Sequence, residues 1–216
     1  MSGRVRLPVA LALAALVAGC TGEAVWAPEA EVQRAAYSPD GPPRLSLLTM
    51  VSNVNDSGGH TALVVDGAQR LMFDPAGSWH HPLVPERNDV LFGMSPQLYD
   101  FYMDYHARET YRVVVQEVPI TSEQAARLST LVQSAGPVPR ANCTRAIAGV
   151  LRETPGFEGL GQTWFPNRLR ADFAALPGVT ETVVYDDDSD DNLELLQAQA
   201  RAARTREIAG RVTADR

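Results

Sequence analysis

The chain has 216 residues, of which 45% are hydrophobic and 21% are charged. It is therefore long enough for one domain with a hydrophobic core, and too apolar to be wholly disordered. Its formal net charge is −7, all 19 basic residues are arginines, and no basic run interrupts the sequence, which argues against a nucleic-acid partner. The two cysteines are too few for a disulfide scaffold or a CxxC-type zinc site.

The first twenty residues have the pattern of an export signal. Two early arginines precede an apolar run over residues 7–18, which is too short to span a bilayer because spanning takes about 20 residues. Small residues end this run, as they do in a signal peptide. The sequence Val17-Ala18-Gly19-Cys20 resembles the lipobox of bacterial lipoproteins, in which the cysteine is lipidated and becomes the mature N-terminus. The resemblance implies a signal peptide over residues 1–19 and a lipid on Cys20; the alternative is a plain secretory signal with an incidental cysteine.

This resemblance also implies a location and a free thiol. The chain would be anchored in the cell envelope and face the periplasm, and Thr21 in place of Asp after the cysteine would imply the outer membrane, as in lipoproteins similar to the enterobacterial ones. Without residues 1–19 the chain carries 17 arginines against 26 acidic residues, which is a net charge of −9. Once lipidated, Cys20 cannot pair with Cys143, which leaves one free thiol in an oxidising compartment.

The remaining sequence divides into a tether, a structured domain and a tail. Residues 20–43 hold four prolines without a sustained hydrophobic period, so we expect a tether that keeps the domain off the membrane. Within the structured part, residues 44–185, apolar runs and turn signals predict a first strand over 45–51 and a hairpin whose strands, 60–65 and 70–74, flank Asp66-Gly67. Later helices are predicted to begin at Ser95-Pro96, at a capping box formed by Thr121 and Gln124, and near Asn142, and a fourth is predicted over 169–176. Later strands are predicted over 110–118 and 179–185. Because these elements show no regular βαβ alternation, we predict an α+β fold with a largely antiparallel sheet.

The last part of the chain, residues 186–216, begins with five aspartates between positions 186 and 191. A calcium-binding loop that starts at Asp186 would need Gly at its sixth position and Glu at its twelfth, but these are Asp191 and Gln197. We therefore expect a solvated acidic linker, followed from Leu193 by a helical tail that docks weakly or frays.

Cys143 is the candidate nucleophile. It follows Asn142, a favourable N-cap residue, and would take the first position of a helix. The positive end of a helix, together with a cationic neighbour, can lower the pKa of a cysteine from about 8.5 to roughly 3.5–7.5. Ile147 and Val150 share its helix face, so the thiol points toward the sheet on which the helix packs. The alternative is a small buried hydrophobic residue, which is the role of most free cysteines.

Four histidines compete as the base that such a thiol needs. His60 opens a strand directly after Gly58-Gly59, so it would be accessible to solvent and yet held by rigid backbone. His106 ends a helix and is expected to be a partner for the negative end of that helix. Trp79 and His80 lie in a loop with His81 and are candidates for substrate contact, or else plain surface residues.

Asp74 is the candidate acceptor that would orient the His60 ring. The proline after it keeps it extended. A three-residue loop over 66–68 would place His60 directly opposite Asp74, whereas a two-residue turn would place it opposite Phe73. The first pairing gives one coherent apolar face, and we prefer it because a one-residue slip exchanges the two faces of a strand.

A histidine that opens a strand after Gly-Gly, an aspartate that closes its hairpin partner and an Asn-capped cysteine on a later helix resemble the papain-like fold of NlpC-type cysteine hydrolases. Because His60 precedes Cys143, the order resembles the circularly permuted branch, which includes lecithin:retinol acyltransferase-like proteins. The resemblance covers about residues 45–151 and implies a papain-like domain over 44–185. It implies Cys143 as nucleophile, His60 as base and Asp74 as third member. Two features depart from the family: the third member is commonly His, Asn or Gln, and a long insertion separates Asp74 from Cys143.

From the family and the envelope location, we expect a cysteine hydrolase that cleaves amide bonds, with cell-wall peptides as substrate and no cofactor, metal or nucleic acid. Three alternatives stay open. The chain could be a non-catalytic envelope lipoprotein that binds a partner or a cell-wall polymer, or it could use the same thiol as an acyltransferase or thioesterase on lipids. A zinc site from His60, Asp74 and His80 or His81 has suitable ligand types but no HExxH-like spacing.

Overall fold

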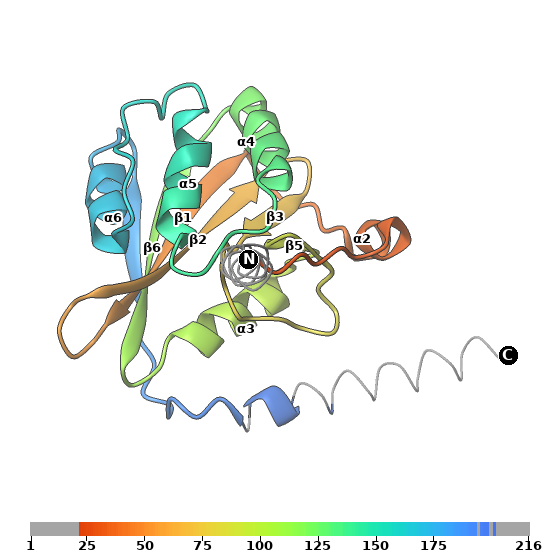
Figure 1. The fold of residues 1–216 in the computed structure, drawn as a ribbon, viewed down its shortest axis with the longest axis vertical. Coiled ribbons are helices and arrows are strands. Elements are labelled where there is room, and N and C mark those ends of the chain that lie inside the picture. Colours follow the sequence, from red (N-terminus) through yellow and green to blue (C-terminus); the bar gives the residue numbers. More distant parts are fainter. Residues whose placement is uncertain (1–21, 194, 199–200, 202–216) are drawn as a thin grey trace, which may run out of the picture.

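In a computed structural model, the described residues are 22–193, 195–198 and 201 (Figure 1). The predicted signal peptide, Cys20 and most of the tail after Leu193 lie outside these residues. The fold is α+β, with one seven-stranded sheet in the order β4-β5-β3-β2-β1-β6-β7 and antiparallel pairing throughout, which confirms the predicted class and the antiparallel sheet. The strands are β1 Arg44–Ser52, β2 Gly58–Asp66, β3 Arg70–Phe73, β4 Glu86–Arg87, β5 Val90–Phe92, β6 Tyr111–Pro119 and β7 Thr180–Val184.

Helices cover both faces of this sheet (Figure 1). They are α2 Glu29–Ala35, α3 Pro96–His106, α4 Ser122–Ser134, α5 Cys143–Arg152 and α6 Pro166–Ala174. Leu47 and Leu63 belong to a core that α4, α5 and α6 close, whereas Leu48 and Val64 belong to a second core that α3 closes. Neighbouring residues of β1 and β2 thus enter different cores, because successive side chains of a strand point to opposite faces.

Three predicted helix starts agree with the structure. At α4 the Thr121 hydroxyl accepts a hydrogen bond from the Gln124 amide, and the Gln124 side chain accepts one from the Thr121 amide, so the capping box is complete. The helix α3 begins at Pro96 after Ser95. The helix α5 begins at Cys143, with Asn142 in the N-cap position, although the Asn142 side chain does not cap it.

The β2–β3 hairpin has a register that neither predicted turn gives. Asp66 lies opposite Arg70 and Leu63 opposite Phe73, so the three-residue loop is 67–69 and not 66–68. The ion pair between Asp66 and Arg70, with nitrogen–oxygen distances of 2.6 and 2.9 Å, closes the hairpin at this point. Because the shift from the preferred register is two residues and not one, every side chain keeps its predicted face.

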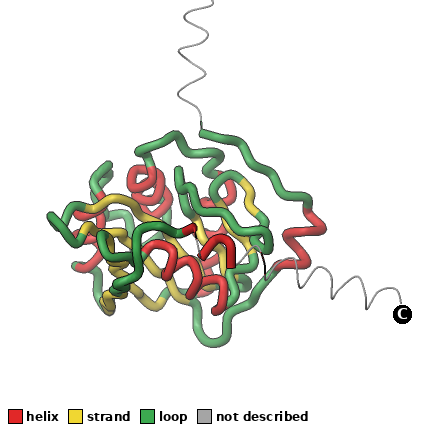
Figure 2. The backbone as a smooth tube through the Cα atoms, turned by 90° about the horizontal axis from the view of Figure 1, so that it is seen from below, coloured by secondary structure: helices red, strands yellow, loops and turns green. Residues whose placement is uncertain are grey.

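The segment expected to be a tether instead packs against the domain from residue 25 onward. The Ala27 amide donates to the Glu86 carbonyl, the Arg70 amide donates to the Tyr37 carbonyl, and Val32 on α2 is buried in the core. Figure 2 shows α2 at the periphery, joined to the rest by loops. The sequence analysis missed α2 and the short strands β4 and β5, which depend on these contacts and not on a hydrophobic period.

The acidic segment after β7 is also not a free linker. Asp188 accepts a hydrogen bond from Arg108 at 3.1 Å, and Asp190 accepts one from the Thr110 hydroxyl at 2.9 Å. Arg108 is only 6% exposed, and a buried cation requires such acidic partners. The segment is therefore held where α3 meets β6. Within the described residues, no helix is both long and apolar enough to cross a bilayer.

Candidate active site

His60 and Asp74 form the closest polar contact of the candidate site. The His60 Nε2 lies 2.6 Å from the Asp74 Oδ1. The two residues do not pair directly, because the β2–β3 ladder ends at Leu63 and Phe73, but they share the α3 face of the sheet and a diagonal neighbour is within reach of a long side chain. Burial alone would lower the pKa of His60, but hydrogen bonds to Asp74 and Cys143 outweigh it and raise this pKa to about 10.

The carboxylate of Asp74 is held from two further sides. It is 4% exposed, and the Tyr102 hydroxyl of α3 donates a hydrogen bond to its Oδ1 at 3.1 Å. Gly77 passes so close that an added Cβ would lie 2.2 Å from its Oδ2, so this position requires glycine. Burial would raise the pKa of Asp74, but the hydrogen bond from His60 and the charge of His60 outweigh it and lower the pKa. Asp74 is therefore an anion that fixes the His60 ring.

Cys143 reaches this pair from the first turn of α5. The Thr144 hydroxyl and the Thr61 hydroxyl share a hydrogen bond of 3.1 Å, and both residues are fully buried. This contact joins the residue after Cys143 to the residue after His60. Since the His60 Nε2 is occupied by Asp74, its Nδ1 is the nitrogen available to the thiol.

The thiol of Cys143 is activated by this arrangement. Burial would raise its pKa, but the hydrogen bond and the positive charge of His60 outweigh burial and lower the pKa to about 7. The Thr144 hydroxyl, 3.7 Å from the Sγ, and the backbone of Thr61 lower it further. Near pH 8 the pair is therefore a thiolate beside an imidazolium, which is the reactive form of a cysteine nucleophile.

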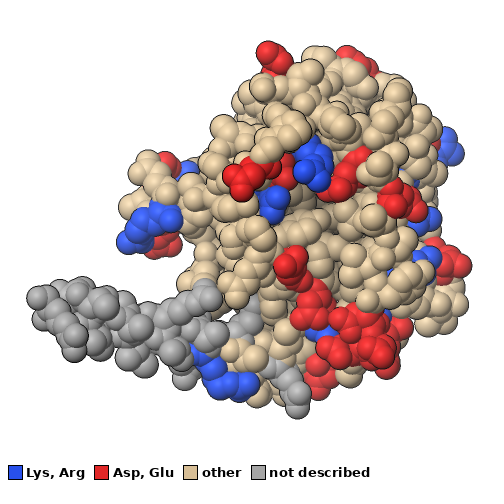
Figure 3. Space-filling model, turned by 180° about the vertical axis from the view of Figure 1, so that it is seen from behind, with Lys and Arg blue, Asp and Glu red and all other residues tan. Residues whose placement is uncertain are grey.

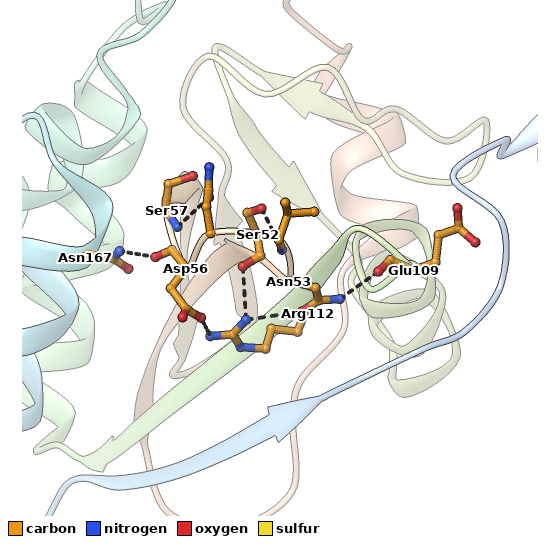
Figure 4. Close-up of polar contacts among 9 residues, drawn as sticks. Ser52, Asn53, Asp56, Ser57, Glu109, Arg112 and Asn167 are labelled. Carbon is orange, nitrogen blue, oxygen red and sulfur yellow. Dashed lines mark hydrogen bonds and ion pairs between the residues drawn. The ribbon is translucent and has the colours of Figure 1, made fainter.

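The loop that leads into His60 is fastened to two other elements (Figure 4). Arg112 of β6 donates to the Asp56 carboxylate at 2.6 Å and to the Ser52 carbonyl at 3.1 Å. Asn167 of α6 donates to the Asp56 carbonyl at 2.7 Å. After this loop the β1–β2 register shifts by one residue at Gly59, so Met50 lies opposite His60 and Val51 opposite Gly58. This bulge and its supports set the position of His60.

His106 does not have the role expected from its place at the end of α3. It is half-buried, and desolvation lowers its pKa to about 4, so it is neutral and cannot act as a charge partner for the helix. Its Nδ1 donates to the Tyr102 carbonyl at 2.8 Å, and its ring stacks on the His60 ring with a centroid distance of 6.5 Å. It therefore packs over the site as a neutral ring.

A cavity of about 500 Å³ opens beside His60. Its walls come from the loop after β3, the end of α3, the start of β6 and the acidic segment. Residues that line it include Gly59, His60, Ser78, Tyr105, Tyr111 and Asp190. Because this volume is within the usual range for ligand pockets, the cavity is the candidate site for the part of a substrate that lies next to the base.

The two predicted substrate contacts lie in different surroundings. His80 is exposed. Trp79 is 4% exposed, and its ring contacts those of Tyr102 and Phe101 at centroid distances of 5.3 and 6.0 Å. Trp79 therefore packs behind Tyr102 in the second core, while contact between His80 and a substrate stays a prediction.

The zinc alternative finds no support among the described residues. There, the one group whose ligand atoms lie close enough to share a metal ion is Asp104, Asp186 and Asp188, and neither His60 nor Asp74 belongs to it. Arg108 lies 3.6 Å from the carboxylate of the first of these aspartates and 3.1 Å from that of the last, so an arginine already supplies positive charge to this group.

Tyr102 is a site residue that the sequence analysis placed only in an apolar stripe of α3. The available signal was its hydroxyl, because a buried tyrosine hydroxyl usually has a hydrogen-bond partner.

We expect Tyr102→Phe to lower the free energy of unfolding by about 1.5–3 kcal/mol, as for other hydrogen bonds to charged groups. Tyr99→Phe, a change on the same helix at a hydroxyl that does not contact the site, should cost less. Denaturant titration of both variants measures the difference, and equal losses would show that the Tyr102 hydroxyl does not support Asp74.

Comparison with known proteins gives no relative: no family model, curated protein or solved structure matches the chain.

Proposed function

We propose that the chain is an envelope lipoprotein whose domain hydrolyses an amide or related acyl bond through a thioester on Cys143. The observation that carries the proposal is the contact of a helix-terminal thiol with a histidine whose other ring nitrogen is held by a buried aspartate. Nucleophile, base and orienting acid in this relation are the general pattern of nucleophilic catalysis. In this proposal the fold is a circularly permuted papain-like domain, with the cysteine helix α5 after the histidine strand β2.

The reaction follows from the charges of the pair. The Cys143 thiolate attacks the carbonyl carbon, and the backbone N–H of Cys143 at the start of α5 helps to hold the oxyanion. As the carbon–nitrogen bond breaks, the His60 imidazolium gives its proton to the leaving amine. A water molecule then attacks the thioester, His60 takes a proton from it, and the acid product leaves the thiol. The amine side of the substrate would lie in the cavity beside His60.

Cell-wall peptides are the proposed substrate, supported by the resemblance to NlpC-type hydrolases and by the predicted envelope location. The test is to incubate the purified chain and its Cys143→Ser variant with cell-wall peptides and, separately, with acyl lipids, and to identify products by mass spectrometry. Release of an amine from peptides only by the unmodified chain supports the proposal. Products from lipids alone would instead indicate a lipid acyltransferase or thioesterase, and no product from either would favour a binding lipoprotein.

A further inference from the structure

The chain enters the described part of the molecule beside the candidate active site. Gly22 lies against the loop that leads into α5, and an added Cβ on Gly22 would be 2.7 Å from the Val138 backbone. The Val138 amide donates to the Asp89 carboxylate at 2.7 Å, and the Asp89 carbonyl accepts from the Asp74 amide at 2.8 Å. Two hydrogen bonds therefore join this loop to the candidate triad.

This entry point limits how far a lipid on Cys20 can be from the site. Two residues span at most about 7 Å when fully extended, and Cys20 precedes Gly22 by two positions. The segment that follows does not extend this reach, because Val25 and Ala27 hydrogen-bond to β4 and to the turn that follows it. The predicted anchor would therefore hold the Cys143 end of α5 close to the bilayer.

The surface on the other side of the same loop is aromatic. Trp164 and Phe165 are 55% and 71% exposed, although large apolar side chains usually favour burial. The Trp164 indole N–H donates to the side chain of Asn142 at 3.3 Å, directly before the candidate nucleophile. Phe165 is fixed through its amide, which donates to the buried Thr163 hydroxyl at 3.1 Å. Both rings are thus presented to solvent by ordered backbone.

Two cations accompany these rings. Arg140 and Arg145 are exposed, the guanidinium of Arg145 lies 5.1 Å from the Trp164 ring centroid, and neither arginine has an acidic ion-pair partner among the described residues. By contrast, Arg108 and Arg112 each pair with aspartates. The rear face in Figure 3 shows the acidic side chains gathered in a patch at its lower edge, where Figure 1 places the segment after β7.

We propose that Arg140, Arg145, Trp164 and Phe165 form a membrane-contacting surface that holds the Cys143 end of α5 against an anionic lipid bilayer. Aromatic rings are favoured at the level of lipid headgroups, and a basic side chain near an anionic membrane gains about 1 kcal/mol. The proposal goes beyond the hydrolase function and does not depend on it, because only the surface and the anchor are involved. Its consequence is that the bilayer would lie next to the first turn of α5, which carries Cys143.

The test measures the depth of Trp164 in the full chain, bound to phosphatidylglycerol vesicles whose acyl chains carry bromine, a short-range quencher of tryptophan fluorescence. A Trp26→Phe background removes the other exposed tryptophan, which leaves Trp164 and the buried Trp79. We expect strong quenching in this background and its loss when Trp164→Phe is added. Quenching that is unchanged by Trp164→Phe, or absent from the background protein, would overturn the proposal.

The charge contribution is tested in the same assay with Arg140→Gln combined with Arg145→Gln. Each change should reduce the equilibrium constant for docking about fivefold, the factor that corresponds to 1 kcal/mol. Arg34→Gln combined with Arg152→Gln is the matched control, since both arginines are exposed, Arg34 lies on α2, and Arg152 lies at the end of α5 opposite Cys143. Equal quenching in the two double variants would contradict the basic part of the surface. Hydrolysis of a water-soluble substrate, measured on the same proteins, separates failure of this surface from failure of the hydrolase proposal.

Discussion

Cys143→Ala should abolish hydrolysis, because among the described residues Cys143 is the one cysteine and no other side chain offers a thiolate. His60→Ala should reduce the rate about 10²–10⁴-fold, the usual contribution of a positioned acid–base group, since the thiol would lose its base and its cationic partner together. Residues that act as a unit do not contribute additively, so the double variant should match Cys143→Ala. The measurement is product release under saturating substrate.

Folding is the control for this set. Neither side chain belongs to one of the two hydrophobic core clusters, so thermal unfolding of Cys143→Ser and of His60→Ala should remain cooperative. A folded Cys143→Ser protein with unchanged hydrolysis would show that the reaction takes place elsewhere.

Asp74→Asn should give an intermediate change, a rate of hydrolysis that lies between the rate of the unmodified chain and that of His60→Ala. Asparagine keeps the shape and a hydrogen bond to the ring but not the charge that helps to raise the pKa of His60 to about 10. With a weaker cation beside it, the Cys143 thiol should form the thiolate at a higher pH than about 7. A pH–rate profile of the variant, recorded next to a thermal unfolding curve, separates this effect from instability.

The width of the pH–rate profile distinguishes a change in the charge of His60 from a loss of structure around it. In the unmodified chain, hydrolysis should rise as pH passes about 7, where the Cys143 thiolate forms, and fall as pH passes about 10, where His60 loses its proton. In Asp74→Asn the lower pH limit should rise and the upper pH limit should fall, so that the active range becomes narrower. A profile of the same width with only a lower maximum would mean that Asp74 supports structure and does not set the charge of His60.

The sequence was sufficient for the parts of the site that local chemistry determines. Asn142 and the apolar spacing after Cys143 predict the helix start. His60 and Asp74 could be placed on one face because a strand alternates with period two, and this conclusion survived a two-residue error in register. The observed register joins the ion pair between Asp66 and Arg70 with the apolar pairs of Leu63 with Phe73 and of Val65 with Leu71. The hydrophobic pattern alone does not distinguish it from a register two residues away.

Other features required the folded chain. The neutral state of His106, which desolvation of its ring produces, depends on packing between α3 and the sheet. The contact of Tyr102 with Asp74 joins residues 28 positions apart, and no local pattern predicts it. The docking of the segment before β1 and of the acidic segment after β7 rests on backbone hydrogen bonds and on the acidic partners of Arg108, so composition alone suggested a tether and a linker.

The most direct measurement of the central claim is the alkylation rate of Cys143 against pH, for the chain and for His60→Ala. If His60 activates the thiol, the rate for the unmodified chain follows a titration with a midpoint at about pH 7. In His60→Ala the midpoint should move from about pH 7 toward the ordinary cysteine value of about 8.5, because the hydrogen bond and the positive charge of His60 are lost while burial remains. Superimposable curves would show that His60 does not tune Cys143 and would contradict the hydrolase proposal.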